Sequence, residues 1–203
     1  MKKHISRRAF IKLGILGGTS SAITAMSLSG RNVPACNAAM KPDNNMVLTA
    51  FFSHTGNTRY MAEQINGRVG GDLLEIKTIK PYLGNDRQVH ITAKNEKRRN
   101  FRPKLSTAMP DTSKYNVFFI GYPCWWHTMP MTMFSFFDQL DLSGKTIIPF
   151  TTHGGSKWGT GLSDLKAINP QSDLKEGLTL YGRSVKKSSS VNEIKNWLSS
   201  SGF

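Results

Sequence analysis

Three apolar runs stand out along the chain, separated by stretches in which apolar residues recur at helical spacing. The runs cover residues 46–52, 115–120 and 146–150, and each leads into a loop rich in Gly, Ser, Thr or Pro. Apolar runs of this length are typical of parallel strands that are buried on both faces. They therefore predict three central strands of a parallel sheet.

The segments between these runs have the pattern of amphipathic helices. Apolar residues recur every three or four positions in three of them: Met61, Ile65 and Val69; Met133, Phe137 and Leu140; Val191, Ile194 and Leu198. A Ser-Val-Asn-Glu sequence at 190–193 predicts a capping box at the start of the last helix. Two shorter strands are expected at 74–78 and 177–182. Five strands with intervening helices predict an α/β fold, an open sheet with helices on both faces.

The segment 80–113 does not follow this alternation. It carries one acidic residue near its centre, Glu96, against six basic ones: Lys94, Lys97, Arg98, Arg99, Arg102 and Lys104. Such a run could bind an anionic partner. It could equally form a solvated helix and loop inserted after the second strand, and we favour this because charge runs usually lie on exposed faces.

Composition places the chain among globular proteins. It has 203 residues, 38% of them hydrophobic, and a net charge of +14 from 27 basic and 13 acidic residues. These values predict one compact domain and exclude collagen-like and low-complexity chains. The two cysteines, Cys36 and Cys124, are too few for a Cys-rich zinc site or a disulfide framework.

The first 39 residues resemble an export signal. They hold six basic residues and no acidic one, followed by a weakly apolar stretch and then small residues. Residues 6–12, S-R-R-A-F-I-K, match the twin-arginine motif S-R-R-x-F-[LI]-K at every position, although an ordinary basic leader is the alternative. We expect cleavage near residue 39, which leaves residues 40–203 with a net charge of +8, outside the cytoplasm and not inserted in a membrane. A lipid anchor on Cys36 is a rival interpretation.

A short polar loop follows the first predicted strand and leads directly into the first predicted helix. It consists of Ser53, His54, Thr55, Gly56, Asn57 and Thr58. Small and hydroxyl residues let several backbone N–H groups converge, and the helix N-terminus adds its positive end, so the loop could cradle a phosphate. A turn that merely caps the helix fits the spacing equally well. The nucleoside-triphosphate and dinucleotide glycine motifs are both absent.

Two later loops make a family resemblance specific. Residues 121–130 are G-Y-P-C-W-W-H-T-M-P, and residues 149–156 are P-F-T-T-H-G-G-S. Together with the first loop they resemble a flavodoxin-like subfamily whose loops contain G-Y-P-x-W-W and T-x-G-G-S. The resemblance covers about residues 46–182. It implies a flavodoxin-like three-layer sandwich, with a five-stranded parallel sheet in the order 2-1-3-4-5 and FMN at its carboxyl edge.

The resemblance also assigns roles to residues. The loop 53–58 would hold the FMN phosphate, and Gly56 would allow close approach. The isoalloxazine would lie against Pro123, Cys124, Trp125 and Trp126, with one of the two tryptophans packed inward. Its other edge would meet His153, Gly154, Gly155 and Ser156. No catalytic residue or metal ligand is assigned, and a plain cap of the following helix is the alternative role of His127. A thiol hydrolase built on Cys124 and His127 is disfavoured, because no carboxylate nearby could orient the histidine.

Two redox functions fit this reading. The first is an electron carrier that acts with a partner protein or a small acceptor, and the second is an FMN-dependent NAD(P)H:quinone or small-acceptor reductase. A binder of nucleic acid or another anionic polymer would suit the sequence pI of about 10.0, but export disfavours it. Electron-carrier flavodoxins are acidic, whereas this chain is basic. Positive groups such as Lys157, with His127 or His153 if protonated, therefore predict a less negative second reduction potential.

Overall fold

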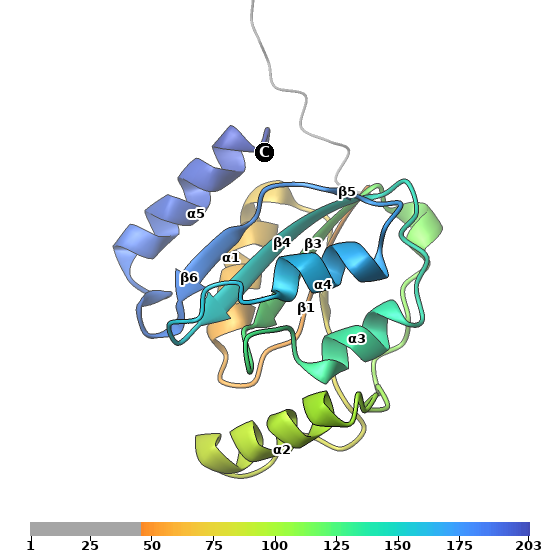
Figure 1. The fold of residues 1–203 in the computed structure, drawn as a ribbon. Coiled ribbons are helices and arrows are strands. Elements are labelled where there is room, and N and C mark those ends of the chain that lie inside the picture. Colours follow the sequence, from red (N-terminus) through yellow and green to blue (C-terminus); the bar gives the residue numbers. More distant parts are fainter. Residues whose placement is uncertain (1–45) are drawn as a thin grey trace, which may run out of the picture. The chain divides into compact units, whose positions relative to one another are not determined.

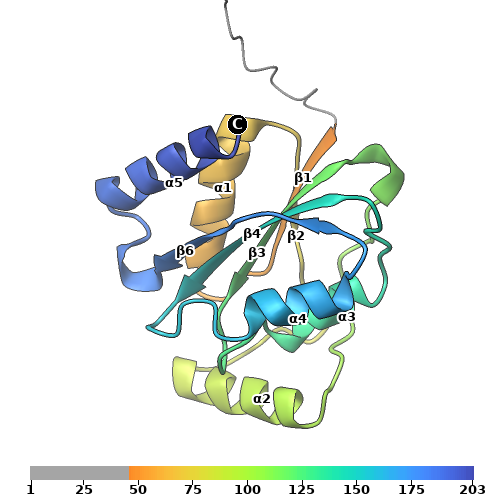
Figure 2. The ribbon, with the colours of Figure 1, turned by 45° about the horizontal axis from the view of Figure 1, so that its top comes forward.

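The computed structural model describes residues 46–203, which form a parallel sheet with helices on both faces (Figures 1 and 2). The strands are β1 (Val47–Phe51), β2 (Asp72–Glu75), β3 (Val117–Pro123), β4 (Thr146–His153), β5 (Asp173–Leu174) and β6 (Leu178–Tyr181). Their order is β2-β1-β3-β4-β5, and β6 also pairs with β4. The predicted α/β fold and strand order are confirmed. The export signal predicted for residues 1–39 lies outside the described residues.

The edge beside β4 differs from the prediction because two short strands share it. β5 pairs with the first two residues of β4, and β6 pairs with the last four. Pro149 lies between these stretches and contributes no N–H group to a ladder. The chain passes close to it, since a Cβ on Gly177 would lie 2.2 Å from the Pro149 carbonyl oxygen. The sheet therefore has six strands rather than five.

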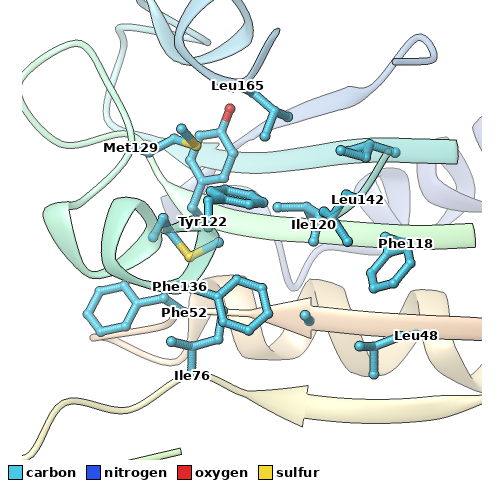
Figure 3. Packing of buried hydrophobic residues seen from close by; sticks show 14 of the residues in the cluster. Leu48, Phe52, Ile76, Phe118, Ile120, Tyr122, Met129, Phe136, Leu142 and Leu165 are labelled. Carbon is cyan, nitrogen blue, oxygen red and sulfur yellow. The ribbon is translucent and has the colours of Figure 1, made fainter. Parts of the chain in front are cut away.

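Alternate residues of the central strands face two separate cores. Phe118, Ile120 and Tyr122 of β3 belong to the core shared with α3 (Met131–Phe137) and α4 (Gly161–Ile168), part of which Figure 3 shows. Phe119 belongs to the core shared with α1 (Asn57–Val69) and α5 (Ser188–Ser200) on the opposite face. A strand covered on both sides needs apolar residues at every position, which explains the unbroken runs.

The start of α5 differs from the predicted capping box. The helix begins at Ser188, and its N-cap residue Lys187 makes no side-chain capping bond. Ser190 therefore lies within the first turn, where its hydroxyl donates to the Ser184 carbonyl at 2.9 Å. This hydroxyl ties the helix to the preceding 3-10 turn instead of capping it, so the capping-box prediction is wrong.

The inserted segment contains α2 (Asp86–Arg98), which begins with a capping box formed by Asn85 and Gln88. Val89 and Ala93 are its buried residues, and the helix packs against α3. Most of its other side chains are exposed, as a solvated helix predicts. Its Lys97, however, makes a contact at the site described below.

None of the helices described between residues 46 and 203 is long and apolar enough to cross a membrane.

Candidate functional site

The carboxyl ends of β1, β3, β4 and β6 border a cavity of about 460 Å³. β1 and β3 are neighbours in the sheet although β2 follows β1 in the chain, so the strand order reverses here. Doubly wound sheets bind ligands at such a switch point. Three loops, α2 and the end of β6 supply the walls.

The loop after β1 leads into the start of α1 without a side-chain cap. Gly56 is the N-cap residue, with φ of 83°, and the first turn carries no acidic side chain. The N–H groups of this first turn and the positive end of the helix dipole are therefore available to an anion. A Cβ on Gly56 would meet nothing within 4 Å, so the space beside its backbone is open. The loop fits a phosphate group.

Ser53 at the head of this loop carries a buried hydroxyl with no hydrogen-bond partner among residues 46–203. An unpaired buried hydroxyl costs about 1–3 kcal/mol, so native structures usually pair it. It lies ahead of an uncapped helix N-terminus, where it could donate to a ligand oxygen. The Thr58 hydroxyl differs, because it shares a buried 2.8 Å hydrogen bond with the Thr152 hydroxyl. The Thr58 hydroxyl therefore already has a protein partner, and its backbone N–H lies in the first turn of α1.

The loop after β3 closes in a tight turn built from bulky residues. Trp125 and Thr128 exchange backbone N–H to oxygen bonds of 2.9 and 3.1 Å. Between them Trp126 and His127 have φ of 51° and 63°. Positive φ at both central residues is typical of a type I′ turn, which usually contains Asn-Gly. Each bulky residue in this region costs on the order of 1 kcal/mol, so the contacts around the turn must hold it.

Contacts from α2 hold the turn on one side. The Trp126 indole N–H donates to the His90 carbonyl at 2.7 Å, and the Lys97 ammonium donates to the Trp126 carbonyl at 2.7 Å. The Lys94 ammonium also lies 4.8 Å from the centroid of the Trp126 ring, within range of a cation–π interaction. We name these three contacts the α2 clamp.

The residues before α4 hold the turn from the other side. Thr160 donates its backbone N–H to the His127 carbonyl at 2.7 Å, and its hydroxyl lies 3.0 Å from the same oxygen and 2.6 Å from a carboxylate oxygen of Asp164. Gly159 precedes it with φ of 54°, and a Cβ there would lie 2.2 Å from the His127 carbonyl oxygen. Only glycine permits this approach. The hydroxyl of Thr128 adds a hydrogen bond to Asp164 of α4.

The two tryptophans of this loop have different surroundings. Trp125 is buried, and its ring meets those of Phe52, His54 and Tyr82 edge-on at centroid distances of 5.5, 5.9 and 5.3 Å. Trp126 is 39% exposed. The expectation that one tryptophan packs inward is therefore confirmed. Both line the cavity and offer aromatic surface to a planar ligand.

The loop after β4 contains a histidine with a defined tautomer. Nδ1 of His153 accepts a hydrogen bond from the Gly155 N–H at 3.0 Å, so the neutral ring carries its proton on Nε2. Burial, and to a smaller degree Lys157, lowers the pKa of His153. The ring is therefore neutral at pH 7, and Lys157 carries the positive charge of this loop.

Cys124 and His127 do not form a nucleophilic pair. Cys124 is partly buried, and burial raises the pKa of its thiol, which favours the poorly nucleophilic protonated form. His127 does not cap α3 either, because Pro130 is the N-cap residue of that helix. The alternative in which His127 simply caps this helix is therefore wrong. Residues 46–203 hold no group of three His, Cys, Asp or Glu side chains that could bind a metal ion.

Most of the predicted cofactor residues gather at the cavity. Ten of the fourteen line it: His54, Thr55, Asn57, Pro123, Cys124, Trp125, Trp126, His153, Gly154 and Ser156. The other four are Ser53, with its unpaired hydroxyl, Gly56, which caps α1, Thr58, which bonds Thr152, and Gly155, which donates to His153. Their assignment as cofactor ligands stays a prediction.

Sequence reasoning missed eight lining residues: Asp86, Val89, His90, His127, Thr152, Tyr181, Gly182 and Arg183. Three of these, at 181–183, lie at the end of a predicted strand. The rule that parallel strands bring their carboxyl ends to one edge could have found them. The three from α2 had no comparable signal, because the path of an insertion does not follow from the strand pattern.

Comparisons with known proteins agree with this architecture. A family model described as Flavodoxin matches residues 46–201. A provisionally described flavoprotein from Bacteroides eggerthii is 34% identical over 76% of this chain and 96% of its own, with a TM-score of 0.64. A second such protein, from Bacteroides uniformis, is 28% identical over 76% of this chain and 98% of its own, with a TM-score of 0.68.

A more distant structure shares the fold. The flavoprotein from Lactobacillus acidophilus, solved in complex with FMN, is 20% identical over 71% of this chain and 99% of its own, with a TM-score of 0.59. A comparison with curated protein sequences gave no match. The family model spans most of the chain, and the Bacteroides eggerthii protein shares a third of its residues in the same arrangement. The chain therefore belongs to the flavodoxin family.

Proposed function

We propose that this chain binds FMN at the carboxyl edge of its sheet and transfers electrons to a partner protein or a small acceptor. The observation that carries the proposal is the uncapped N-terminus of α1, preceded by the buried and unpaired hydroxyl of Ser53. The arrangement lies where the strand order reverses. The FMN complex of the Lactobacillus acidophilus protein, which has the same fold, supports the same cofactor here.

The residues around the cavity would divide the cofactor between a phosphate end and a ring end. Backbone N–H groups of residues 55–58 and the Ser53 hydroxyl would hold the phosphate. Trp125, Trp126 and Pro123 would enclose the ring and exclude water from it. When bound, a flavin supplies one- and two-electron redox chemistry.

The loop after β4 would set the charge and polarity at the far edge of the flavin ring. The Nε2–H of neutral His153 is a hydrogen-bond donor, and the backbone N–H groups of residues 154 and 156 can offer further donors, since that of Gly155 is bonded to His153. Lys157 adds a positive charge one residue beyond the lining. A cation near the ring favours the acceptance of an electron, because it offsets the added negative charge.

A carrier role is favoured over a reductase role. Residues 46–203 form one sheet with its helices, and the flavodoxin model accounts for nearly all of them. No second domain for a nicotinamide is left in this described part of the chain. Turnover separates the two: rapid oxidation of NADH or NADPH with a quinone would select the reductase, and its absence in a protein that is reversibly reduced would select the carrier.

We further propose that the protein acts outside the cytoplasm. The support is the full match of residues 6–12 to the twin-arginine motif. Replacing both arginines, Arg7→Lys and Arg8→Lys, is expected to retain the protein in the cytoplasm, as measured by cell fractionation. Unchanged export of this double variant would contradict the proposal.

The binding proposal is tested by removing the unpaired hydroxyl. Ser53→Ala is expected to weaken FMN binding about ten- to a hundredfold, because a hydrogen bond to a charged group contributes about 1.5–3 kcal/mol. The same variant should raise the melting temperature of the FMN-free protein, because no buried hydroxyl is then left unpaired. Calorimetric FMN titration and thermal unfolding measure the two effects.

A matched control comes from β6. Thr179 also has a buried hydroxyl without a partner among residues 46–203, and it does not line the cavity. Thr179→Val should stabilise the protein without changing its affinity for FMN. The proposal fails if Ser53→Ala binds FMN as well as the parent chain, or if the parent stays colourless with excess FMN.

A further inference from the structure

A second cavity, of about 510 Å³, lies between α2 and the strand-like segments on either side of it in the chain. Its walls come from residues 78–83, from the face of α2 that carries Val89, Thr92 and Glu96, and from Phe101, Pro103 and Lys104. The two flanking segments are joined by an antiparallel bridge between Thr78 and Leu105. The volume is within the range of small-molecule sites. Nothing in the proposed flavin chemistry uses this cavity.

The walls of this cavity leave large apolar side chains open to water. Ile79, Leu83 and Phe101 are 60%, 78% and 53% exposed, and all three line it. They are three of the seven large apolar residues that are exposed among residues 46–203. Single exposed apolar residues need no explanation, but three around one hollow indicate a surface that an apolar ligand would cover.

The charged groups at this cavity favour an anion. Lys80 and Lys104 line it, and neither has a carboxylate within 4.0 Å among the described residues. The opposing charge is Glu96, whose carboxylate accepts a 2.7 Å hydrogen bond from the Tyr82 hydroxyl. That hydroxyl also contacts the Thr132 hydroxyl at 3.0 Å. The lining of the cavity therefore includes two lysines without a carboxylate partner and one carboxylate that already has a hydrogen-bond partner.

We propose that this cavity binds a small amphipathic anion, with an apolar body against Ile79, Leu83 and Phe101 and a carboxylate-type head at Lys80 and Lys104. A neutral apolar molecule would leave both ammonium groups unpaired, and a cationic one would be repelled by them. The proposal commits to a free small molecule and does not depend on FMN binding.

The cavity is not isolated from the candidate flavin site. Val89 lines both cavities, and the ring of Tyr82 lies 5.3 Å from that of Trp125. An occupant would therefore press on residues that also form the wall of the flavin pocket. Because of this contact, binding is best measured directly, on the protein as purified with whatever flavin it carries.

Decanoate is a suitable probe, with decanol and decylammonium as neutral and cationic counterparts of the same chain length. We expect calorimetry to give binding of decanoate at least tenfold tighter than that of either counterpart. The double variant Lys80→Gln/Lys104→Gln should remove most of this preference. Lys187→Gln/Lys195→Gln makes the same change in charge at exposed positions of α5 and its N-cap, and should leave binding unchanged.

Two further variants distinguish the cavity from general charge effects. Thr92→Trp places a large ring on the cavity wall and should reduce decanoate binding more than tenfold, with the fold checked by circular dichroism. Glu96→Gln removes the one negative charge and keeps an acceptor for Tyr82, so it should tighten binding two- to threefold. A loss of binding in every variant, including the α5 control, would overturn the proposal.

The remaining outcomes also decide the matter. Equal binding of decanol and decanoate would show an apolar site without charge recognition, and unaltered binding by Thr92→Trp would place the probe elsewhere. Sedimentation with phosphatidylglycerol vesicles, without binding of monomeric decanoate, would assign the surface to a membrane instead. Each of these results contradicts the proposal for the second cavity. None of them bears on the proposal that the chain binds FMN, which the FMN titrations test separately.

Discussion

The candidate flavin pocket has two walls of different origin. One wall consists of the loops after β1, β3 and β4, and it supplies the helix N-terminus, the unpaired Ser53 hydroxyl and the neutral His153. The other is α2, which belongs to the insertion between β2 and β3 and reaches the pocket through Val89 and its clamp on Trp126. The sheet thus determines where a phosphate would bind, while an insertion holds in place the tryptophan loop that would cover the ring.

The largest expected effect comes from breaking the sheet-derived wall at Gly159. Gly159→Ala would bring a Cβ to 2.2 Å from the His127 carbonyl oxygen, at a backbone φ of 54°. Overpacking and the strained φ together should cost about 3 kcal/mol, or roughly 6–12 °C in melting temperature. FMN affinity should fall at least tenfold, because the Trp126–His127 turn must move.

Gly144→Ala is the matched control for this clash. Gly144 also has positive φ, at 71°, but a Cβ there would meet nothing within 4 Å. Its expected cost is only about 1 kcal/mol, with no change in FMN affinity. Equal destabilisation of the two variants would show that backbone strain, rather than the contact with His127, is what Gly159 relieves.

The second prediction tests the α2 wall. Trp126→Phe keeps an aromatic ring but removes the indole N–H that donates to the His90 carbonyl. The hydrogen bond stabilises α2 against local unfolding by about 1 kcal/mol. Its loss should speed hydrogen exchange of the α2 amides about fivefold and leave exchange in β3 and β4 unchanged. FMN affinity should fall by a smaller factor than in Gly159→Ala.

Trp197→Phe is the control, because the Trp197 indole also donates to a backbone carbonyl, that of Glu176, at 3.3 Å on the opposite face of the sheet. It should not change exchange in α2. If α2 exchanges at the parent rate in Trp126→Phe, the clamp does not position the helix, and the two walls are independent.

The difference between the sheet-derived wall and the α2 wall also explains which parts of the site could be predicted from the sequence. Buried strands such as 115–120 leave a clear apolar signal, and the loops after them inherit their place from strand order, so ten cofactor candidates gathered at one cavity. The turn at Trp126 and His127 gave no signal, because its positive φ values rest on contacts with His90, Lys97 and Thr160 that are distant in sequence. The place of α2 was hidden for the same reason.

The third prediction compares the charge that each wall offers to the ring. Lys157 belongs to the sheet-derived wall, and Lys94 of α2 lies over the partly exposed Trp126 ring. Lys157→Gln should make the second reduction potential of bound flavin more negative, because it should raise the free energy of adding the second electron by up to about 1 kcal/mol. Lys94→Gln should change this potential less. Spectroelectrochemical titration measures both. A larger effect of Lys94→Gln would mean that α2, rather than the sheet edge, sets the electrostatics of the ring.

The smallest effect is expected at Glu96, on the second-cavity side of α2. Burial raises the pKa of Glu96, although the hydrogen bond from Tyr82 lowers it in part. A carboxyl whose folded pKa is raised stabilises the folded state below its ordinary pKa and loses that contribution as pH rises to the folded pKa. Above this window the parent chain holds a partly buried charge that Glu96→Gln lacks.

Glu96→Gln should therefore melt up to about 2 °C higher than the parent at pH 7, and the difference should shrink as the pH falls to 4. The amide oxygen can still accept from Tyr82, so the hydrogen bond is kept. Glu193→Gln, at an exposed position of α5, is the control and should show no such pH dependence. If Glu96→Gln instead melts lower at pH 7, the charged hydrogen bond to Tyr82 outweighs the burial of Glu96. α2 would then be held by a charged hydrogen bond at the second cavity, as it is held at the flavin pocket by Lys97, so that polar contacts would fix the helix on both sides.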